Sequence, residues 1–223
     1  MPLTMIIVLV LAVAAGFAAH GSLRPFEHLR VHLWGLAVAG LLLQAIPLPH
    51  ETSSAAVGGL FALSYVLLIA CVWVNRRLPV AGLILLGLAL NMLVVVPNGG
   101  MPVSAQAVRI SGGSVEDLPA AGGSSKHHLM TDDDVLRPLG DVIPGPPPLS
   151  DVLSIGDLFL YVGLGCFVVL VMLGRSGENR RPPARWFQMY RGQHQHVRRG
   201  PRSSRARLRP ALPAAAARSG TQP

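Results

Sequence analysis

Five polar residues lie within long apolar runs or are expected close to one common end of those runs, where a side chain able to do chemistry is unusual. They are Gln44, Asn91, Asn98, Asp141 and Asp157. Polar groups within membrane helices are costly and usually face the interior of a bundle, so they mark candidate sites. Two carboxylates beside amides could do acid–base work on a peptide or a lipid ester. Asp141 and Asp157 are therefore candidate catalytic residues, and the three amides are candidate members of a polar cluster.

A structural role for the same residues competes with the catalytic one, and we prefer it. Ser154-Ile155-Gly156-Asp157 has the pattern of a capping box, in which the two polar side chains bind free N–H groups at a helix start. Asp141 would then merely end a short helix. Gln44 and Asn91 would bond to each other across two helices, a contact worth about 0.6 kcal/mol on average in membrane proteins.

Two adjacent histidines precede three aspartates and suggest a metal site. His127 and His128 come shortly before residues 132–134, and imidazole with carboxylate is a common ligand set for divalent metals. Adjacent side chains point in different directions, however, so we expect a solvated loop and no metal, and keep His128 in the outer polar cluster. Cys71 and Cys166 form no CxxC pair and are expected to be packing thiols. No nucleotide-binding or hydrolase motif appears, so we expect no cofactor.

The apolar runs themselves predict membrane spans. The chain is 51% hydrophobic and 13% charged, against about 25% charged in an average soluble domain. A helix needs about 20 residues to cross the hydrocarbon layer, and only helices or closed barrels satisfy their backbone there. The fold class we predict is an all-α membrane protein with a five-transmembrane-helix bundle, whose spans are residues 3–19, 31–48, 55–74, 78–96 and 155–173.

Charge sets the expected orientation. Arg24 and Arg30 follow the first run, and Arg76 and Arg77 follow the third, whereas the loop after the second run has no Lys or Arg. Because Lys and Arg in short loops stay cytoplasmic, the N-terminus is expected outside and the C-terminus inside the cell membrane. No basic n-region precedes residues 3–19, so we expect an uncleaved anchor.

Two long stretches lie outside the expected spans. Residues 97–154 are rich in Gly and Pro clusters typical of turns, so we expect an irregular extracytoplasmic segment without a core of its own. Within it, residues 131–141 are expected to form a short helix capped by Thr131. Residues 174–223 hold twelve Arg and one Glu, a net +11, and we expect a disordered cytoplasmic tail.

Several short motifs resemble a bacterial domain-of-unknown-function family, numbered 5317. The motifs are residues 97–104 (Pro-Asn-Gly-Gly-Met-Pro-Val-Ser), His128, residues 139–144 (Leu-Gly-Asp-Val-Ile-Pro), residues 154–157 (Ser-Ile-Gly-Asp), residues 21–24 and residues 41–44. The resemblance covers roughly residues 4–173 and leaves out the tail. It implies a small multi-pass membrane protein and adds no reaction.

The function favoured by these patterns is a non-enzymatic envelope scaffold or accessory protein. Its partners would be the lipid bilayer, anionic headgroups at the Arg-rich tail, and another membrane protein; nucleic acid is not expected. One alternative is a membrane-surface hydrolase that uses Asp141 and Asp157. A second is a small-solute channel or transporter lined by Gln44 and Asn91, although no span has a central charged residue.

Overall fold

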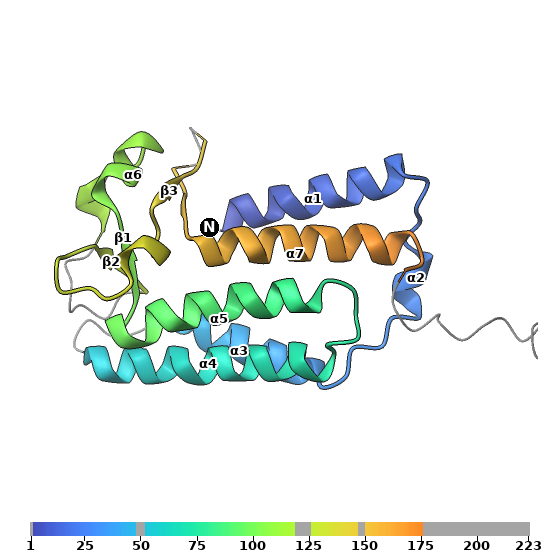
Figure 1. The fold of residues 1–223 in the computed structure, drawn as a ribbon, viewed down its shortest axis with the longest axis horizontal. Coiled ribbons are helices and arrows are strands. Elements are labelled where there is room, and N and C mark those ends of the chain that lie inside the picture. The colour runs from blue at the N-terminus through green and yellow to red at the C-terminus, as the bar shows by residue number, and fades with distance from the viewer. Residues whose placement is uncertain (1, 48–51, 119–125, 147–149, 176–223) are drawn as a thin grey trace, which may run out of the picture. The chain divides into compact units, whose positions relative to one another are not determined.

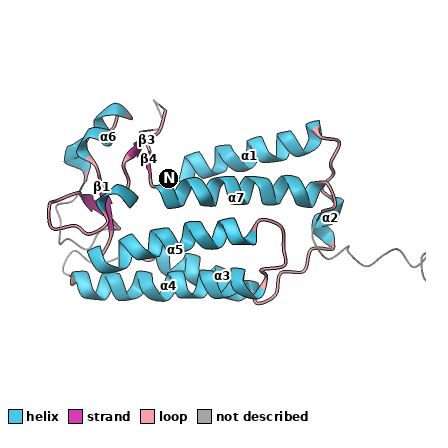
Figure 2. Ribbon diagram, in the orientation of Figure 1, coloured by secondary structure: helices cyan, strands magenta, loops and turns pink. Residues whose placement is uncertain are grey.

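The computed structural model describes residues 2–47, 52–118, 126–146 and 150–175, and these ranges are mostly helical (Figures 1 and 2). Residues 176–223, which make up nearly all of the expected Arg-rich tail, lie outside the described residues. Five of the helices carry the apolar runs and form a bundle: α1 (Pro2–Ala18), α3 (Trp34–Ala45), α4 (Ser54–Val74), α5 (Ala81–Asn98) and α7 (Ile155–Met172). Two short helices, α2 (Arg24–Glu27) and α6 (Ala105–Ile110), lie between them.

Three helices are long and apolar enough to cross a membrane. They are Ala55–Val74 within α4, together with α5 and α7. The expected runs at residues 3–19 and 31–48 also form apolar helices, but α1 has 17 residues and α3 only 12. The described α3 is short because Leu33 takes a left-handed conformation just before it, with φ 54°. It stops at Ala45, since Pro47 favours an extended Ile46.

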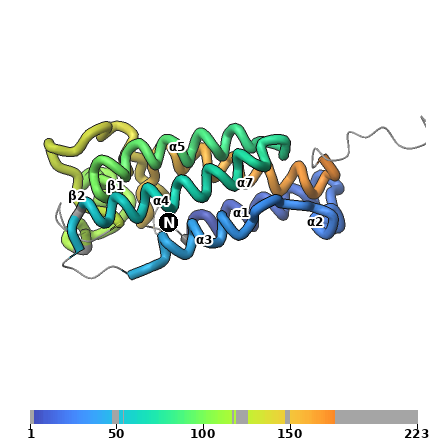
Figure 3. The backbone as a smooth tube through the Cα atoms, turned by 90° about the horizontal axis from the view of Figure 1, so that it is seen from below, coloured from blue at the N-terminus to red at the C-terminus, as the bar shows by residue number. Residues whose placement is uncertain are grey.

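The five bundle helices contact one another in the order α3, α4, α5, α7, α1. Successive bundle helices run in alternating directions along the chain, so α1, α4 and α7 share one direction (Figures 1 and 3). Glycines permit close approach at the contacts: a Cβ on Gly40 would lie 3.0 Å from the Ser64 carbonyl oxygen, and a Cβ on Gly87 would lie 2.7 Å from that of Gly156.

The main hydrophobic cluster lies between α4 and α5 and reaches the strand that follows α5. Its buried members come from all three elements: Val57, Phe61, Tyr65, Leu88, Val94, Val95 and Met101. This cluster therefore joins the bundle to the residues that follow Asn98.

The segment at residues 97–154 is more ordered than its composition predicts. It contains β1 (Met101–Val103) paired in parallel with β2 (His127–Leu129), and β3 (Ile143–Pro144) antiparallel to β4 (Val152–Leu153). It also has a small core of its own, formed by Val103, Ala107, Val108 and Val152. The expectation of a segment without a core was wrong because its few apolar residues are brought together by pairings between distant positions.

The short helix expected over residues 131–141 is also absent from the described chain. Only a 3₁₀ turn forms there, at Arg137–Leu139, and Leu136 before it is left-handed with φ 55°. The capping relation is reversed, because the Asp134 carboxylate accepts hydrogen bonds from the backbone N–H and the hydroxyl of Thr131. A side chain that binds the backbone in this way competes with helix formation.

Candidate functional site

Four of the sequence motifs, residues 97–104, His128, residues 139–144 and residues 154–157, lie at one end of the bundle (Figure 1). Residues 21–24 lie at the other end, where the Ser22 N–H donates to the Met172 carbonyl of α7. Helix α5 ends at Asn98, its C-cap Gly99 takes the left-handed conformation with φ 65°, and the chain then enters β1. The backbone of Asp141 lies beside β1. Its N–H donates to the Pro102 carbonyl at 2.9 Å, and its carbonyl accepts from the Ser104 N–H at 2.9 Å. Gly140 allows this approach, because a Cβ there would lie 2.7 Å from the Pro102 carbonyl oxygen.

Asp157 belongs to a hydrogen-bonded cluster at the start of α7. The Ser154 N–H donates to Oδ2 of Asp157 at 3.1 Å, and the Asp157 N–H donates to the Ser154 hydroxyl at 2.9 Å. The amide of Asn91 on α5 donates to Oδ1 of Asp157 at 2.8 Å, and its own oxygen accepts from the Ser154 hydroxyl at 2.9 Å. All three side chains are buried. The predicted capping box is confirmed, and both Asp157 oxygens are occupied.

Asn91 bonds to α7 and not to Gln44, so the expected contact between these two amides was wrong. The reason is the packing order, in which α5 lies between α4 and α7 while α3 contacts α4. Gln44 is half-buried on α3. Within the described chain its side chain makes no hydrogen bond to the other candidates.

Asn98 and His128 hold the loop that follows β2. The Asn98 amide donates to the Val135 carbonyl at 3.0 Å and its oxygen accepts from the Val135 N–H at 2.9 Å. Nε2 of His128 lies 2.9 Å from Oδ1 of Asp134, with both side chains buried. Burial raises the pKa of Asp134, but the hydrogen bonds from Thr131 and His128 outweigh it and leave that pKa below its ordinary value.

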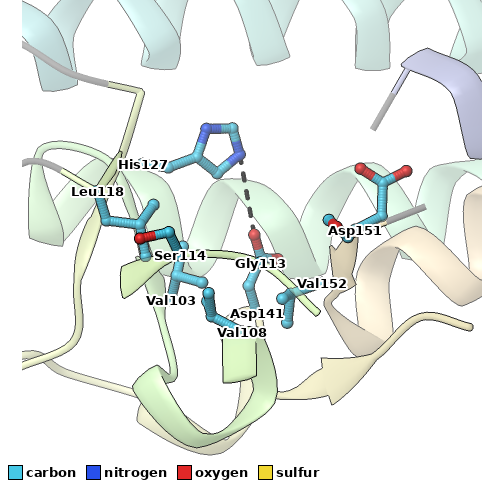
Figure 4. A pocket seen from close by; sticks show the side chains of 10 residues that line it. Val103, Val108, Gly113, Ser114, Leu118, His127, Asp141, Asp151 and Val152 are labelled. Carbon is cyan, nitrogen blue, oxygen red and sulfur yellow. Dashed lines mark ion pairs between the residues drawn. The ribbon is translucent and has the colours of Figure 1, made fainter. Parts of the chain in front are cut away.

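Asp141 differs from these residues because one of its buried oxygens is unused. The residue is 1% exposed, and its Oδ1 has no hydrogen-bond partner among the described residues. Its Oδ2 lies 3.8 Å from Nε2 of His127, and the two side chains point toward each other (Figure 4). Burial, and then the negative charge of Asp157, raise the pKa of Asp141 well above its ordinary value.

His127 occupies the opposite face of β2 from His128, as expected for neighbours in a strand. Its side chain is 37% exposed, yet protein crowds the imidazole, and this burial lowers the pKa of His127. The two histidines therefore have separate neighbours. Among the described residues no group of three His, Cys, Asp or Glu side chains is placed to hold a metal ion.

Asp141 and His127 border a pocket of about 290 Å³. The pocket is lined by polar and apolar residues from several separate parts of the 97–154 segment: Val103, Val108, Gly113, Ser114, Leu118, His127, Asp141, Ser150, Asp151 and Val152 (Figure 4). Asp157 is not among these residues. Sequence reasoning selected Asp141 but missed the pocket, and the one available signal was that alternation along a strand would separate His127 from His128.

The sequence profile of a family of unknown function, DUF5317, matches residues 28–169. The chain belongs to DUF5317. The match contains α3, α4, α5, the 97–154 segment with its pocket, and most of α7. It is narrower than the resemblance over residues 4–173, since α1 and residues 21–24 fall outside it. Neither a curated protein nor a solved structure matches this DUF5317 chain.

Proposed function

We propose that the protein is a five-pass membrane protein with its N-terminus and residues 97–154 outside the cell membrane. The alternating directions of the bundle helices support this, because every connection then lies at one of two ends (Figure 1). Helix α3 is short for a crossing, at about 18 Å for 12 residues. Its exposed Trp34, Leu41 and Leu42 nevertheless present an apolar surface suited to lipid.

Charges at the end of the bundle away from the 97–154 segment support the proposed orientation. Arg24 and Arg30 lie between α1 and α3, and Arg76 and Arg77 lie between α4 and α5. The guanidinium of Arg76 stacks over the exposed Trp73 ring, 5.2 Å from its centroid. Arg in short loops favours a cytoplasmic face, and Trp suits the membrane interface on either side.

Within this architecture we propose a non-enzymatic scaffold or accessory role. The observation that carries it is the closed network of Asn91, Ser154 and Asp157, whose side chains are bonded to one another across α5 and α7. A hydrolase using Asp141 and Asp157 would need the Asp157 carboxylate free for substrate, and a channel lined by Asn91 would need that amide free. The Arg-rich tail would supply contacts to anionic headgroups and to a membrane protein partner.

Topology is tested in the full-length chain with Cys71 and Cys166 replaced by Ala. Glu27→Cys, Thr52→Cys and Ser114→Cys are each exposed to a membrane-impermeant maleimide in intact cells. We expect labelling at positions 52 and 114 and none at position 27 until the membrane is permeabilised. Equal labelling at positions 27 and 52 would show that α3 does not cross. A reporter fused after Gly192 should lie on the side opposite to position 114.

The scaffold role is tested by deleting residues 192–223. We expect the shortened protein to insert normally and to lose a co-purifying membrane protein. As a control, the same residues are replaced by a Gly/Ser stretch of equal length, which should also lose the partner. An unchanged set of co-purifying proteins in both variants would contradict the proposed tail contact.

A further inference from the structure

The Asp141 carboxyl at the edge of the pocket has one oxygen without a hydrogen-bond partner among the described residues, and this oxygen has no role in the proposed scaffold. The other acidic side chain of the pocket, Asp151, is bonded to the Thr4 hydroxyl of α1. Asp157 and Asp134 are bonded on both oxygens. Asp141 alone among the buried side chains of the described residues keeps an oxygen without a hydrogen bond. A buried polar atom without a hydrogen-bond partner destabilises the folded state, so its presence here calls for an explanation.

The residues that line the pocket indicate what kind of molecule could pair with the Asp141 carboxyl. Among the described residues, two carboxyls and an imidazole line the pocket, and no Lys or Arg side chain does. Val103, Val108, Leu118 and Val152 supply apolar surface beside these groups. A volume of about 290 Å³ is at the lower limit for ligand pockets, which are apolar clefts with a few placed polar groups. The occupant is therefore small, partly apolar and positively charged or rich in hydrogen-bond donors.

We propose that this pocket binds a small organic molecule with a primary ammonium group and a short apolar body. The ammonium pairs with the Asp141 carboxylate, and the apolar body lies against the valines and Leu118. The ammonium is then the missing hydrogen-bond donor, and a hydrogen bond between two charged groups is stronger than one between neutral groups. A divalent metal is a poorer occupant, since the described residues offer no group of three ligating side chains.

The charge state of the free pocket is consistent with this occupant. Burial and the negative charge of Asp157 hold the pKa of Asp141 well above its ordinary value, which favours the neutral acid when nothing is bound. A bound ammonium favours the carboxylate, so binding should expel a proton. The titratable groups that act on this carboxyl are His127, Asp151, Asp157 and the N-terminal amino group, whose positive charge lowers the pKa of Asp141.

The test is titration calorimetry of the full-length protein in lipid nanodiscs with n-butylammonium chloride, and with 1-butanol as the neutral analogue. We expect butylammonium to bind and 1-butanol to bind about tenfold more weakly or not at all. Asp141→Asn should weaken the binding of butylammonium by about tenfold or more. The matched control is Asp132→Asn, because the exposed Asp132 carboxylate pairs with Arg137 away from the pocket. It should leave binding unchanged.

A second variant covers the case in which Asp141→Asn does not fold. Ser114 is exposed and lines the pocket, so Ser114→Trp should fill the space, leave Asp141 intact and abolish binding. The proposal is overturned if butylammonium does not bind the wild type. It is also overturned if butanol binds equally well, or if either folded pocket variant binds butylammonium as the wild type does. Loss of the tail partner in residues 192–223 would not affect any of these results.

Discussion

The network of Asn91, Ser154 and Asp157 makes a quantitative prediction about single side chains. Ser154→Ala removes a helix cap and a bond to Asn91, so it should lower the free energy of unfolding by about 0.5–2 kcal/mol. Asn91→Ala and Asp157→Ala should be non-additive, with a coupling of about 0.6–1.7 kcal/mol as found for bonded pairs in membranes. Unfolding in mixed micelles measures both. Ser53→Ala is the control, because Ser53 caps α4 through one exposed bond, and it should cost less than Ser154→Ala. Fully additive effects would show that the network does not link the helices.

The contributions of Asp141 and Asp134 to the free energy of unfolding should change with pH in opposite directions. The pKa of Asp141 is raised by burial and by Asp157, so its stabilising contribution is complete below the ordinary value of 3.8 and is lost as pH rises through the folded-state pKa. The pKa of Asp134 is lowered by its bonds to Thr131 and His128, so its contribution is present above the ordinary value and is lost as pH falls. Each unit of difference between the folded-state and unfolded-state pKa corresponds to a contribution of about 1.4 kcal/mol to the free energy of unfolding.

The measurement for this pair is the thermal midpoint in detergent from about pH 3 to about pH 8. The difference in thermal midpoint between the wild type and Asp141→Asn should fall as pH rises. The neighbouring titratable groups are His127, Asp151, Asp157 and the N-terminal amino group. The midpoint relative to Asp134→Asn should fall as pH drops. A constant difference between wild type and Asp141→Asn would show that the carboxyl is not held in its neutral form.

At the scale of elements, the close contact of α5 with α7 depends on glycine at particular positions. A Cβ on Gly87 would lie 2.7 Å from the Gly156 carbonyl oxygen, which is backbone and cannot move aside alone. Gly87→Ala should therefore destabilise the bundle by about 1–3 kcal/mol. Gly82→Ala in the same helix is the matched control, because nothing lies within 4 Å of its Cβ position, and it should be neutral or gain up to about 1 kcal/mol. Equal stability of the two variants would place the α5–α7 contact elsewhere.

The helices were predictable from the sequence and the 97–154 segment was not, for a physical reason. An apolar run specifies a helix through local hydrogen bonds, so α4, α5 and α7 begin and end within about three residues of the expected bounds. The pairing of Met101 with His127 and the bridge between Val103 and Asp141 join positions far apart in the chain. The capping box at Ser154 is local and was predicted, whereas the unpaired oxygen of Asp141 depends on those distant pairings.

At the scale of the whole bundle, the order of helix contacts predicts unequal stability. Helices α4, α5 and α7 each pack against two neighbours, whereas α3 contacts α4 and α1 contacts α7. Among the described residues of α3 only Gly40 is buried. Segments with few buried contacts open locally at low free energy, and amide hydrogen exchange reports that opening. We therefore expect amides of α3 to exchange fastest among the bundle helices, and those of α5 slowest.

Hydrogen exchange followed by mass spectrometry, in detergent micelles, checks this order. Gly40→Leu would displace α3, since a Cβ at Gly40 already lies 2.9 Å from Leu68 and 3.0 Å from the Ser64 carbonyl oxygen. It should speed exchange in α3 and leave α7 unchanged. Gly35→Leu is the matched control on the same helix, because nothing lies within 4 Å of its Cβ position. If α3 is as protected as α5 in the wild type, then a further surface covers α3, and a second copy of the chain would be the first partner to test.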